Sequence, residues 1–249
     1  MRILVLGSTG YHPNERRHTS CVMFPEFGGI FDAGTAFFRV IEHLETKELD
    51  IFLSHAHLDH VVGLTYLLDV MRSSDVKRVV VRGEAEKLAA VEEHLFADLI
   101  FPLSPPAELV PLEEEPFSLR GGAEVRHFQL DGHPGGTVGY RIDEGGKSCA
   151  YVPDTRVLKE PGYLDAIRGV DLLIHECNFR DGFEEIAAKS GHSCTSQVAA
   201  LAARAGVGRL LLTHFDAREE GEDPVGIDRA RAIFPRTDLA EDGMEIIVS

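Results

Sequence analysis

Three histidines and one aspartate stand within six consecutive positions of the chain, in the segment His55-Ala56-His57-Leu58-Asp59-His60. The segment follows the apolar run Asp50-Ile51-Phe52-Leu53, which is short enough to form a buried strand. The four polar side chains therefore leave the end of a strand together, and we expect a helix over residues 61–71 to follow. Neutral imidazole and carboxylate are preferred ligands of zinc and related divalent metals. Because clustered histidines are costly to bury without a partner, the pattern predicts a metal site.

Three later segments each place another potential ligand at the end of a strand-like run. They are His133 in Gly132-His133-Pro134-Gly135-Gly136, Asp154 at the end of Ala150-Tyr151-Val152-Pro153-Asp154, and His214 at the end of Leu211-Leu212-Thr213-His214. A His-x-His-x-Asp-His segment after a hydrophobic strand, followed in order by these residues, resembles the metallo-β-lactamase superfamily. Each later motif is weak alone, but the ordered set is strong and spans most of the chain. The resemblance implies an α/β fold, the αββα sandwich.

The same resemblance implies two divalent cations that divide the potential ligands between them. One metal would be held by His55, His57 and His133, the second by Asp59, His60 and His214, with Asp154 as the bridge. A shared carboxylate relieves the repulsion between cations roughly 3.5–4 Å apart. A water bridging them would become hydroxide near neutral pH and act as the nucleophile. Zinc is the first expectation, and mixed nitrogen and oxygen ligands also admit manganese or iron.

The segment Gly191-His192-Ser193-Cys194-Thr195 precedes a predicted helix over 195–204, with Ser193 or Thr195 as its N-cap. It resembles the Gly-His-Ser-Thr segment of ribonuclease Z and its relatives. In that group the histidine is thought to assist protonation of the leaving group, so we expect His192 to be catalytic. The alternative for His192 is an ordinary residue of the capping loop.

Two early segments, Arg17-His18-Thr19-Ser20-Cys21 and Phe31-Asp32-Ala33-Gly34, resemble motifs of ribonuclease Z and of small-molecule cyclic phosphodiesterases. We expect Asp59 to act in catalysis as well as in metal binding. Substrate binding is assigned to Arg17, Ser193 and Arg218. For Arg218, a solvated loop arginine is an equal alternative.

One departure from ribonuclease Z bears on the substrate. Bacterial ribonuclease Z enzymes carry a long arm for tRNA between the histidine and the bridging aspartate of these motifs. Here Asp154 follows His133 by only 21 positions, and a hairpin with the turn Glu144-Gly145-Gly146-Lys147 fills the interval. The expected substrate is therefore a small cyclic or linear phosphodiester, and the nearest resemblance is to the phosphoribosyl cyclic phosphodiesterases of phosphonate breakdown.

Several other histidines have structural alternatives. His175 and Glu176 end a strand-like run near the site, where a structural or supporting role is favoured over metal binding. His12 could line the pocket or be a solvated loop residue. Two cysteines, Cys177 and Cys194, stand near the site but are not favoured as ligands.

The elements that position these residues recur in both halves of the chain. Strands are expected at 3–6, 19–24, 29–32, 50–54, 76–81, 124–130, 137–143, 147–152, 171–175, 209–213 and 244–248. Helices are expected at 36–46, 61–71, 84–95, 195–204 and 225–233. The proline-rich segment 101–116 is interpreted as a surface connection between the halves of a single domain, residues 1–249.

The composition excludes several classes of protein. A chain of 249 residues with 44% hydrophobic content can bury a large core, and no apolar run approaches a membrane span. Forty-one acidic against 25 basic residues give a net charge of −16, without the basic stripe expected of a protein that binds long nucleic acids. Four cysteines without paired spacing favour reduced thiols and a cytoplasmic location. A homodimer is compatible with the sequence.

Three functions remain open at this stage. The first is a dinuclear metal phosphodiesterase for small substrates, with an armless ribonuclease Z-like nuclease as its variant. The second is hydrolysis of a lactone or thioester at the same site. The third is a non-catalytic, metal-dependent sensor, which is disfavoured because all seven potential ligands and His192 are present.

Overall fold

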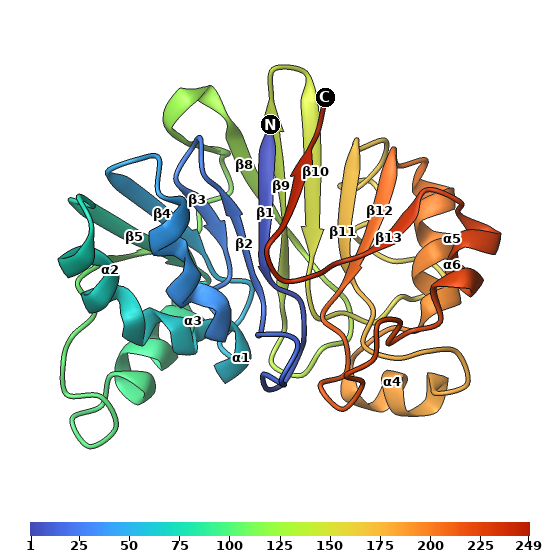
Figure 1. Ribbon diagram of the computed structural model, residues 1–249, viewed down its shortest axis with the longest axis horizontal. Helices are drawn as coiled ribbons and strands as arrows, with labels where there is room; N and C mark the ends of the chain where they lie inside the picture. Colours follow the sequence, from blue (N-terminus) through green and yellow to red (C-terminus); the bar gives the residue numbers. More distant parts are fainter.

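The computed structural model describes residues 1–249 and contains two seven-stranded sheets that face each other, with helices on their outer sides (Figure 1). The strand order is β14-β1-β2-β3-β4-β5-β6 in the first sheet and β13-β12-β11-β10-β9-β8-β7 in the second. Both sheets mix parallel and antiparallel pairs. This architecture confirms the predicted αββα sandwich.

The first sheet contains β1 (Arg2–Gly7), β2 (Cys21–Phe24), β3 (Gly29–Phe31), β4 (Glu48–Phe52), β5 (Arg78–Gly83), β6 (Glu108–Pro111) and β14 (Met244–Ile247). The second contains β7 (Phe117–Ser118), β8 (Glu124–Gln129), β9 (Val138–Glu144), β10 (Lys147–Val152), β11 (Leu172–Glu176), β12 (Arg209–Thr213) and β13 (Thr237–Leu239).

The helical segments of the first half are η1 (Thr35–His43), α1 (Leu58–Val61), η2 (Val62–Tyr66), α2 (Leu67–Ser73), α3 (Ala85–Ala90), η3 (Val91–Leu95) and the short turn η4 (Arg120–Gly122). Those of the second half are α4 (Glu184–Ser190), α5 (Thr195–Ala205) and α6 (Ile227–Ile233).

The side chains of strand β1 pack into two different hydrophobic layers, one on each face of the sheet. Ile3 and Val5 belong to the core between the sheets, whereas Leu4 and Leu6 belong to the layer that includes residues of η1, η2 and α2. A strand that is buried on both faces carries a continuous apolar run instead of an alternating one. The run over 3–6 was therefore sufficient to predict a strand but not to show which face points inward.

The helix expected over 61–71 differs from the observed structure. The observed helical stretch begins at Leu58 and changes from α1 to the 3₁₀-helix η2 and then to α2. The N–H of Gly63 donates to the carbonyl of Ala33 (2.7 Å) instead of continuing the helix. A Cβ at Gly63 would lie 2.4 Å from both the Gly34 carbonyl oxygen and the Phe37 Cβ. Close packing against residues 33–37 therefore imposes the break. The helix expected over 36–46 is the shorter 3₁₀-helix η1.

The segment 101–116 does connect the first sheet to the second, but it also contains a strand that was not predicted. The segment contains β6, which pairs in parallel with β5, with Val81 opposite Leu109. Pro111 ends this strand at the margin of the sheet, where a missing N–H is tolerated. The short elements β7, β13 and α4 were also not predicted.

The predicted hairpin between His133 and Asp154 is present as β9 and β10. Lys147 pairs with Glu144, so the turn consists of Gly145 and Gly146, both of which have positive φ. Two-residue turns of this kind match the twist of the flanking strands. The interval therefore contains a compact hairpin and no arm.

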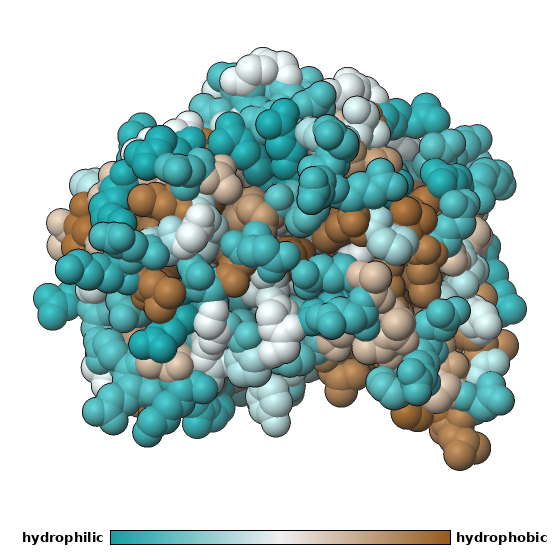
Figure 2. Space-filling view, turned by 180° about the vertical axis from the view of Figure 1, so that it is seen from behind, coloured by the Kyte–Doolittle hydropathy of each residue, from teal (hydrophilic) through white to brown (hydrophobic).

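The face of the molecule seen in Figure 2 is mainly hydrophilic, with hydrophobic residues exposed in places. The connection from η3 to β6 protrudes at the lower left of Figure 1. It includes three exposed apolar residues, Leu99, Ile100 and Leu103. All four cysteines are buried free thiols. None of the helices combines the length and apolar composition needed to cross a membrane.

Candidate metal centre

The predicted ligands lie in loops after the carboxyl ends of strands. The loop after β4 contains residues 54–60, Asp154 follows β10, and His214 directly follows β12. The pairs β3–β4–β5 and β10–β11–β12 are parallel, so their carboxyl ends share one edge of each sheet. The N–H of Val138 donates to the Ser54 carbonyl (3.1 Å) and joins the two sheets there. In Figure 1 this is the lower edge, between α1 and α4.

A first cluster consists of His55, His57, His133 and Asp154, whose potential ligand atoms all lie within 4.8 Å of one another. Nε2 of His133 is 3.1 Å from Nδ1 of His57 and 3.6 Å from Oδ2 of Asp154. Nε2 of His55 is 3.7 Å from the same Asp154 oxygen. Three imidazole nitrogens therefore surround one side of the carboxylate.

A second cluster consists of Asp59, His60, His214 and again Asp154, within the same 4.8 Å limit. Oδ1 of Asp154 lies 3.0 Å from Nε2 of His214 and 3.3 Å from Nε2 of His60. Oδ2 of Asp59 lies 3.3 Å from Nε2 of His214. The two oxygens of Asp154 thus face different clusters, and the structure brings all seven predicted ligands together in the predicted division.

Burial makes the histidines of the first cluster suited to metal binding. It lowers the pKa of His55 well below the ordinary value and also lowers the pKa values of His57 and His133. The neutral imidazole is the form that coordinates metals. These three residues therefore present free nitrogen lone pairs at neutral pH.

The second cluster instead favours positive charge. Burial acts to lower the pKa of His60, but the carboxylates of Asp154, Asp32 and Asp59 outweigh it and raise this pKa well above its ordinary value. Burial would raise the pKa of Asp154, yet His214 and His60 hold it well below its usual range. A group of carboxylates that stabilises a cation between them suits a divalent metal.

The cluster also leaves bonding capacity unmet. His55 Nε2 and Asp154 Oδ1 are buried atoms without a hydrogen bond of acceptable geometry. The salt-bridge partners of Asp59 and Asp154 are all histidines, with no lysine or arginine among them. Buried polar atoms in proteins are normally paired. Both the donor set and these unpaired atoms fit divalent cations.

Asp32 supports the second cluster in a way that the sequence did not reveal. His60 donates from Nδ1 to its carboxylate (2.7 Å), and Ser54 donates from both N–H and Oγ (2.8 Å each). Tyr151 contributes a further hydrogen bond from its hydroxyl (2.8 Å). Asp32 has φ of 58°, a left-handed conformation in a non-glycine residue. It fixes His60 with Nε2 directed at Asp154, as carboxylates commonly orient metal-binding histidines. Its position at the end of β3, beside β4, was the available signal.

His192 lies beside both clusters, in the loop between α4 and α5. Its ring centroid is 5.1 Å from that of His133 and 5.5 Å from that of His214. Nδ1 of His192 is 3.7 Å from Oε2 of Glu176, which is a charge contact longer than a hydrogen bond. Burial acts to lower the pKa of His192, but the Glu176 carboxylate outweighs it and raises the pKa to about 9.

His175 and Glu176, at the end of β11, were predicted to have a structural or supporting role, and the structure gives each of them a different one. Glu176 faces His192 and accepts the N–H of Asn178 (2.9 Å). His175 is buried and is hydrogen-bonded to the Glu176 carbonyl (2.7 Å) and the Tyr163 hydroxyl (3.1 Å), so its ring has a structural role.

The structure contradicts the substrate-binding role of Arg17. Its side chain is fully buried, donates to the Gly221 carbonyl and Glu241, and lies over the ring of Phe215. The guanidinium therefore joins the N-terminal loop to the C-terminal segment and cannot reach a ligand. Arg218, in contrast, is exposed at the rim and paired with Asp216.

The prediction for Ser193 was also wrong. Its buried hydroxyl donates to the Thr155 carbonyl (2.8 Å) and accepts the N–H of Val157 (3.0 Å), which ties the His192 loop to the Asp154 loop. Neither Ser193 nor Thr195 caps α5. The N-cap is Cys194, whose N–H donates to the Gln197 side chain (3.0 Å), while Thr195 donates to the Val225 carbonyl.

The metal centre opens into a hollow of about 450 Å³, within the usual range for small-molecule sites. The wall beyond the clusters includes Tyr11, His12, Asn178, Phe179, Asp216 and Arg218. His12 therefore lines the hollow. A substrate would meet His192 on one side and the loop of Arg218 on the other.

Comparison with known proteins gives consistent results. Residues 30–215 match the family model described as a beta-lactamase superfamily domain, a range that includes every candidate ligand. Ribonuclease Z of Archaeoglobus fulgidus is 27% identical over 306 aligned residues, covering 100% of this chain and 98% of the relative. The metallo-beta-lactamase fold protein YhfI of Bacillus subtilis has a TM-score of 0.78 at 20% identity, with 98% of each chain covered. A diphosphatase from the PhnP family has a TM-score of 0.76 at 21% identity, covering 100% of this chain and 98% of that one.

Proposed function

The chain belongs to the beta-lactamase superfamily, as a hydrolase of its metal-dependent type, and we propose that it is a dinuclear phosphodiesterase for small substrates. Residues 1–249 would act as one domain, because both halves supply ligands to one site. The observation that supports the proposal most directly is the position of Asp154. Each of its oxygens faces a different cluster, which is the arrangement that a bridging ligand between two cations requires.

The proposed ligand sets are those of the two clusters. His55, His57 and His133 would hold one divalent cation, and the second would be held by Asp59, His60 and His214. Zinc suits this mixture of imidazole and carboxylate, and manganese or iron are the alternatives. Cations held there supply Lewis acidity for the phosphoryl oxygens and a water whose pKa falls to about 7.

The protein side chains around the ligands would supply orientation and a proton. His192, kept protonated by Glu176, would give a proton to the departing oxygen. Asp59 accepts the N–H of Tyr11 (2.7 Å). It would therefore bind metal and also hold the loop of Tyr11 beside the hollow over the metal centre. Arg218 at the rim is the remaining proposed contact for a substrate anion.

Three features favour a small substrate over tRNA. The alignment with ribonuclease Z extends over 306 positions against 249 residues here, so the relative has segments without a counterpart in this chain. The interval between His133 and Asp154 contains only the β9–β10 hairpin. A net charge of −16 also opposes binding of a long polyanion. Similarity to ribonuclease Z along the whole chain keeps an armless nuclease as the second candidate.

The test compares catalytic efficiencies on four kinds of substrate with zinc-loaded protein. The substrates are a ribose cyclic phosphate, a precursor tRNA, a lactone and a thioester, with bis(p-nitrophenyl) phosphate as a general reporter. The expected result is the highest kcat/KM on the small phosphodiester, with RNA binding that is weak and depends little on salt. Specific 3′ cleavage of the tRNA at higher efficiency would establish the nuclease instead. Faster hydrolysis of the lactone or thioester would reject the phosphodiesterase.

A further inference from the structure

A second hollow, of about 280 Å³, lies directly beside the metal centre. It shares Asn178, Phe179, Asp216 and Arg218 with the hollow over the metal clusters. The two hollows are therefore neighbours, and a substrate with its phosphate at the metal centre would extend into the side hollow past these four shared residues. The remaining wall is formed by Arg180, Phe183, Glu219 and Pro224.

The side hollow contains a partly exposed aromatic ring, that of Phe183. Phe183 is 42% exposed, although it is a large apolar side chain. Its ring lies within 20° of parallel to that of the buried Phe179, with centroids 6.4 Å apart. An open ring supported by a second ring offers a flat face on which a planar ligand group can stack.

Two arginines flank these rings in an otherwise acidic protein. Arg180 pairs with Glu219, and Arg218 pairs with Asp216 through Nε and Nη2. Both arginine side chains are exposed, and Nη1 of Arg218 has no protein partner among its hydrogen bonds. The rim thus presents both N–H donors and carboxylate acceptors beside an aromatic face.

This combination matches the planar ring and polar edge of a nucleobase. Bases stack on aromatic side chains and arginine planes and are recognised by hydrogen bonds along their edges. An acyl chain would gain nothing from the four charged groups at the rim, and the volume is too small for a run of several nucleotides.

We propose that the side hollow binds the nucleobase of the substrate, which would make the protein a hydrolase of nucleotide esters. Phe183 supplies the stacking surface, while Arg180 and Arg218 contact the base edge or the adjoining phosphate. This inference rests on the proposed phosphodiesterase activity and narrows its substrate class.

The test uses two p-nitrophenyl phosphodiesters that differ only in the base, namely p-nitrophenyl thymidine 5′-phosphate and its abasic deoxyribose counterpart. Stacking of one base contributes roughly a 5- to 150-fold preference, so the base-bearing ester should have the higher kcat/KM by a factor in that range. The difference should lie mainly in KM, because the base is bound before and during the reaction. The Phe183→Ala variant should lose the preference, and Phe183→Tyr should keep it.

Two controls make the outcome specific. Phe38 is 46% exposed on η1 and lies outside the side hollow, so Phe38→Ala should keep the full preference for the base. Calorimetric titration with thymidine 5′-monophosphate gives a readout independent of turnover, and binding should weaken in Phe183→Ala.

The results separate this inference from the proposed function. Hydrolysis of both esters with equal efficiency, or an equal loss on both in Phe183→Ala, would refute the nucleobase site while leaving the phosphodiesterase intact. Failure to hydrolyse any phosphodiester would refute the proposed phosphodiesterase activity. The calorimetric titration with thymidine 5′-monophosphate would then test the nucleobase site independently. Binding of thymidine 5′-monophosphate that is unchanged in Phe183→Ala would refute the site in either case.

Discussion

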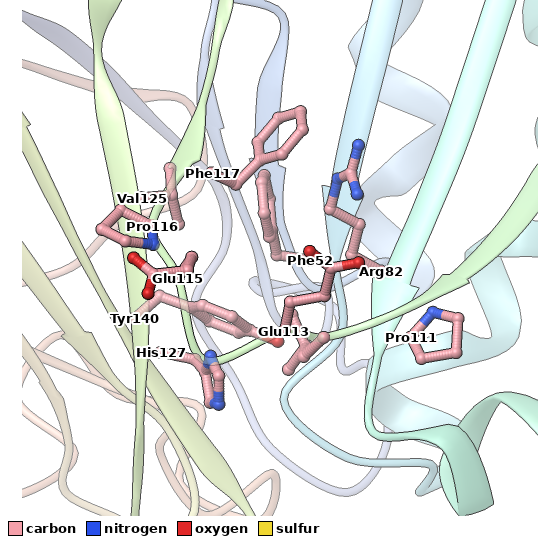
Figure 3. Close-up of a pocket in the computed structure, with 11 residues that line it drawn as sticks. Phe52, Arg82, Pro111, Glu113, Glu115, Pro116, Phe117, Val125, His127 and Tyr140 are labelled. Atoms are coloured by element: carbon pink, nitrogen blue, oxygen red, sulfur yellow. The ribbon is translucent and has the colours of Figure 1, made fainter.

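Among the hollows that contain polar side chains, two use these groups differently. The metal centre is one. The other, of about 200 Å³, lies between the two sheets near β6 and β7, where Arg82, Glu113, Glu115 and His127 surround a patch of aromatic rings (Figure 3). This edge hollow resembles the metal centre in composition, because charged groups, a histidine and apolar side chains line it.

Two polar side chains that line the edge hollow, Arg82 and Tyr140, form hydrogen bonds within the protein. Arg82 donates from Nε to Asp50 (3.1 Å), and its guanidinium lies 3.5 Å from the centroid of the Phe117 ring. The Tyr140 hydroxyl donates to the Leu53 carbonyl (2.5 Å). Figure 3 shows Arg82, Phe52 and Phe117 grouped on one side of the hollow.

The metal centre shows the opposite behaviour. His55 Nε2 and Asp154 Oδ1 have no hydrogen-bond partner, and the carboxylates of Asp59 and Asp154 converge there without a lysine or arginine. Buried polar atoms without a hydrogen-bond partner therefore occur among the groups of the metal centre, and none occurs at the edge hollow. The experiments that follow test this distinction, beginning with the largest expected effect.

Replacing Asp154 with alanine should abolish most activity and release one of two bound metals. Two neighbouring cations would lose their shared anion, so the loss should exceed the roughly 10- to 100-fold typical of residues that only support a ligand. Elemental analysis of protein purified without chelator measures the metal content, with about two ions per wild-type chain expected.

The matched variant is Asp154→Asn, which keeps the shape of the side chain and removes its charge. If the negative charge of Asp154 is needed to bridge the two cations, Asp154→Asn should lose activity and metal as Asp154→Ala does. Two metals and near-normal turnover in both variants would show that Asp154 is not the bridge. Absence of bound transition metal in the wild type, with no activity on adding any, would reject the metal centre itself.

Replacing His192 with alanine should leave the metal content unchanged and slow hydrolysis of diesters with poor leaving groups by about 10²–10⁴-fold. A nitrophenolate needs little protonation as it leaves, so nitrophenyl esters should be affected much less. Because the proton donor must be protonated, the wild-type rate on poor leaving groups should fall as the pH rises through the pKa of His192. Rate profiles against pH for both kinds of ester give the measurement.

The control for this pH dependence is Glu176→Gln. The Glu176 carboxylate raises the pKa of His192, so its neutral replacement should lower that pKa and move the alkaline fall in rate to lower pH. Equal losses on both kinds of ester in His192→Ala would mean that the imidazole positions the substrate instead of donating a proton.

The smallest effect on activity is expected at the edge hollow. Arg82→Met leaves the largely buried carboxylate of Asp50 without its partner and should destabilise the fold by about 1–3 kcal/mol. Activity per folded molecule and metal content should stay at wild-type values. Denaturant unfolding of Arg82→Met, Asp50→Asn and the double variant measures the coupling between the two residues. A large loss of activity without a loss of stability would show that the edge hollow is itself functional.

The sequence by itself determined the type and order of the potential ligands and their placement after strands. This worked because strand runs are local patterns, and because residues that follow parallel strands reach the same edge of a sheet. The resemblance to the metallo-β-lactamase superfamily supplied the division of the ligands, with His55 and His57 in one set and Asp154 as the bridge, before any distance was known. The short β9–β10 hairpin was predictable for the same reason, since its turn depends on Gly145 and Gly146 alone.

Tertiary structure alone decided which polar side chains remain available to a ligand. Arg17 pairs with Glu241, more than 200 positions away, and Ser193 bonds to the loop after Asp154, so neither faces the hollow. Asp32 became a support for His60 only through the pairing of β3 with β4. The physical reason is that a side chain's burial and hydrogen bonds depend on distant segments packed against it, and no local pattern in the sequence records those partners.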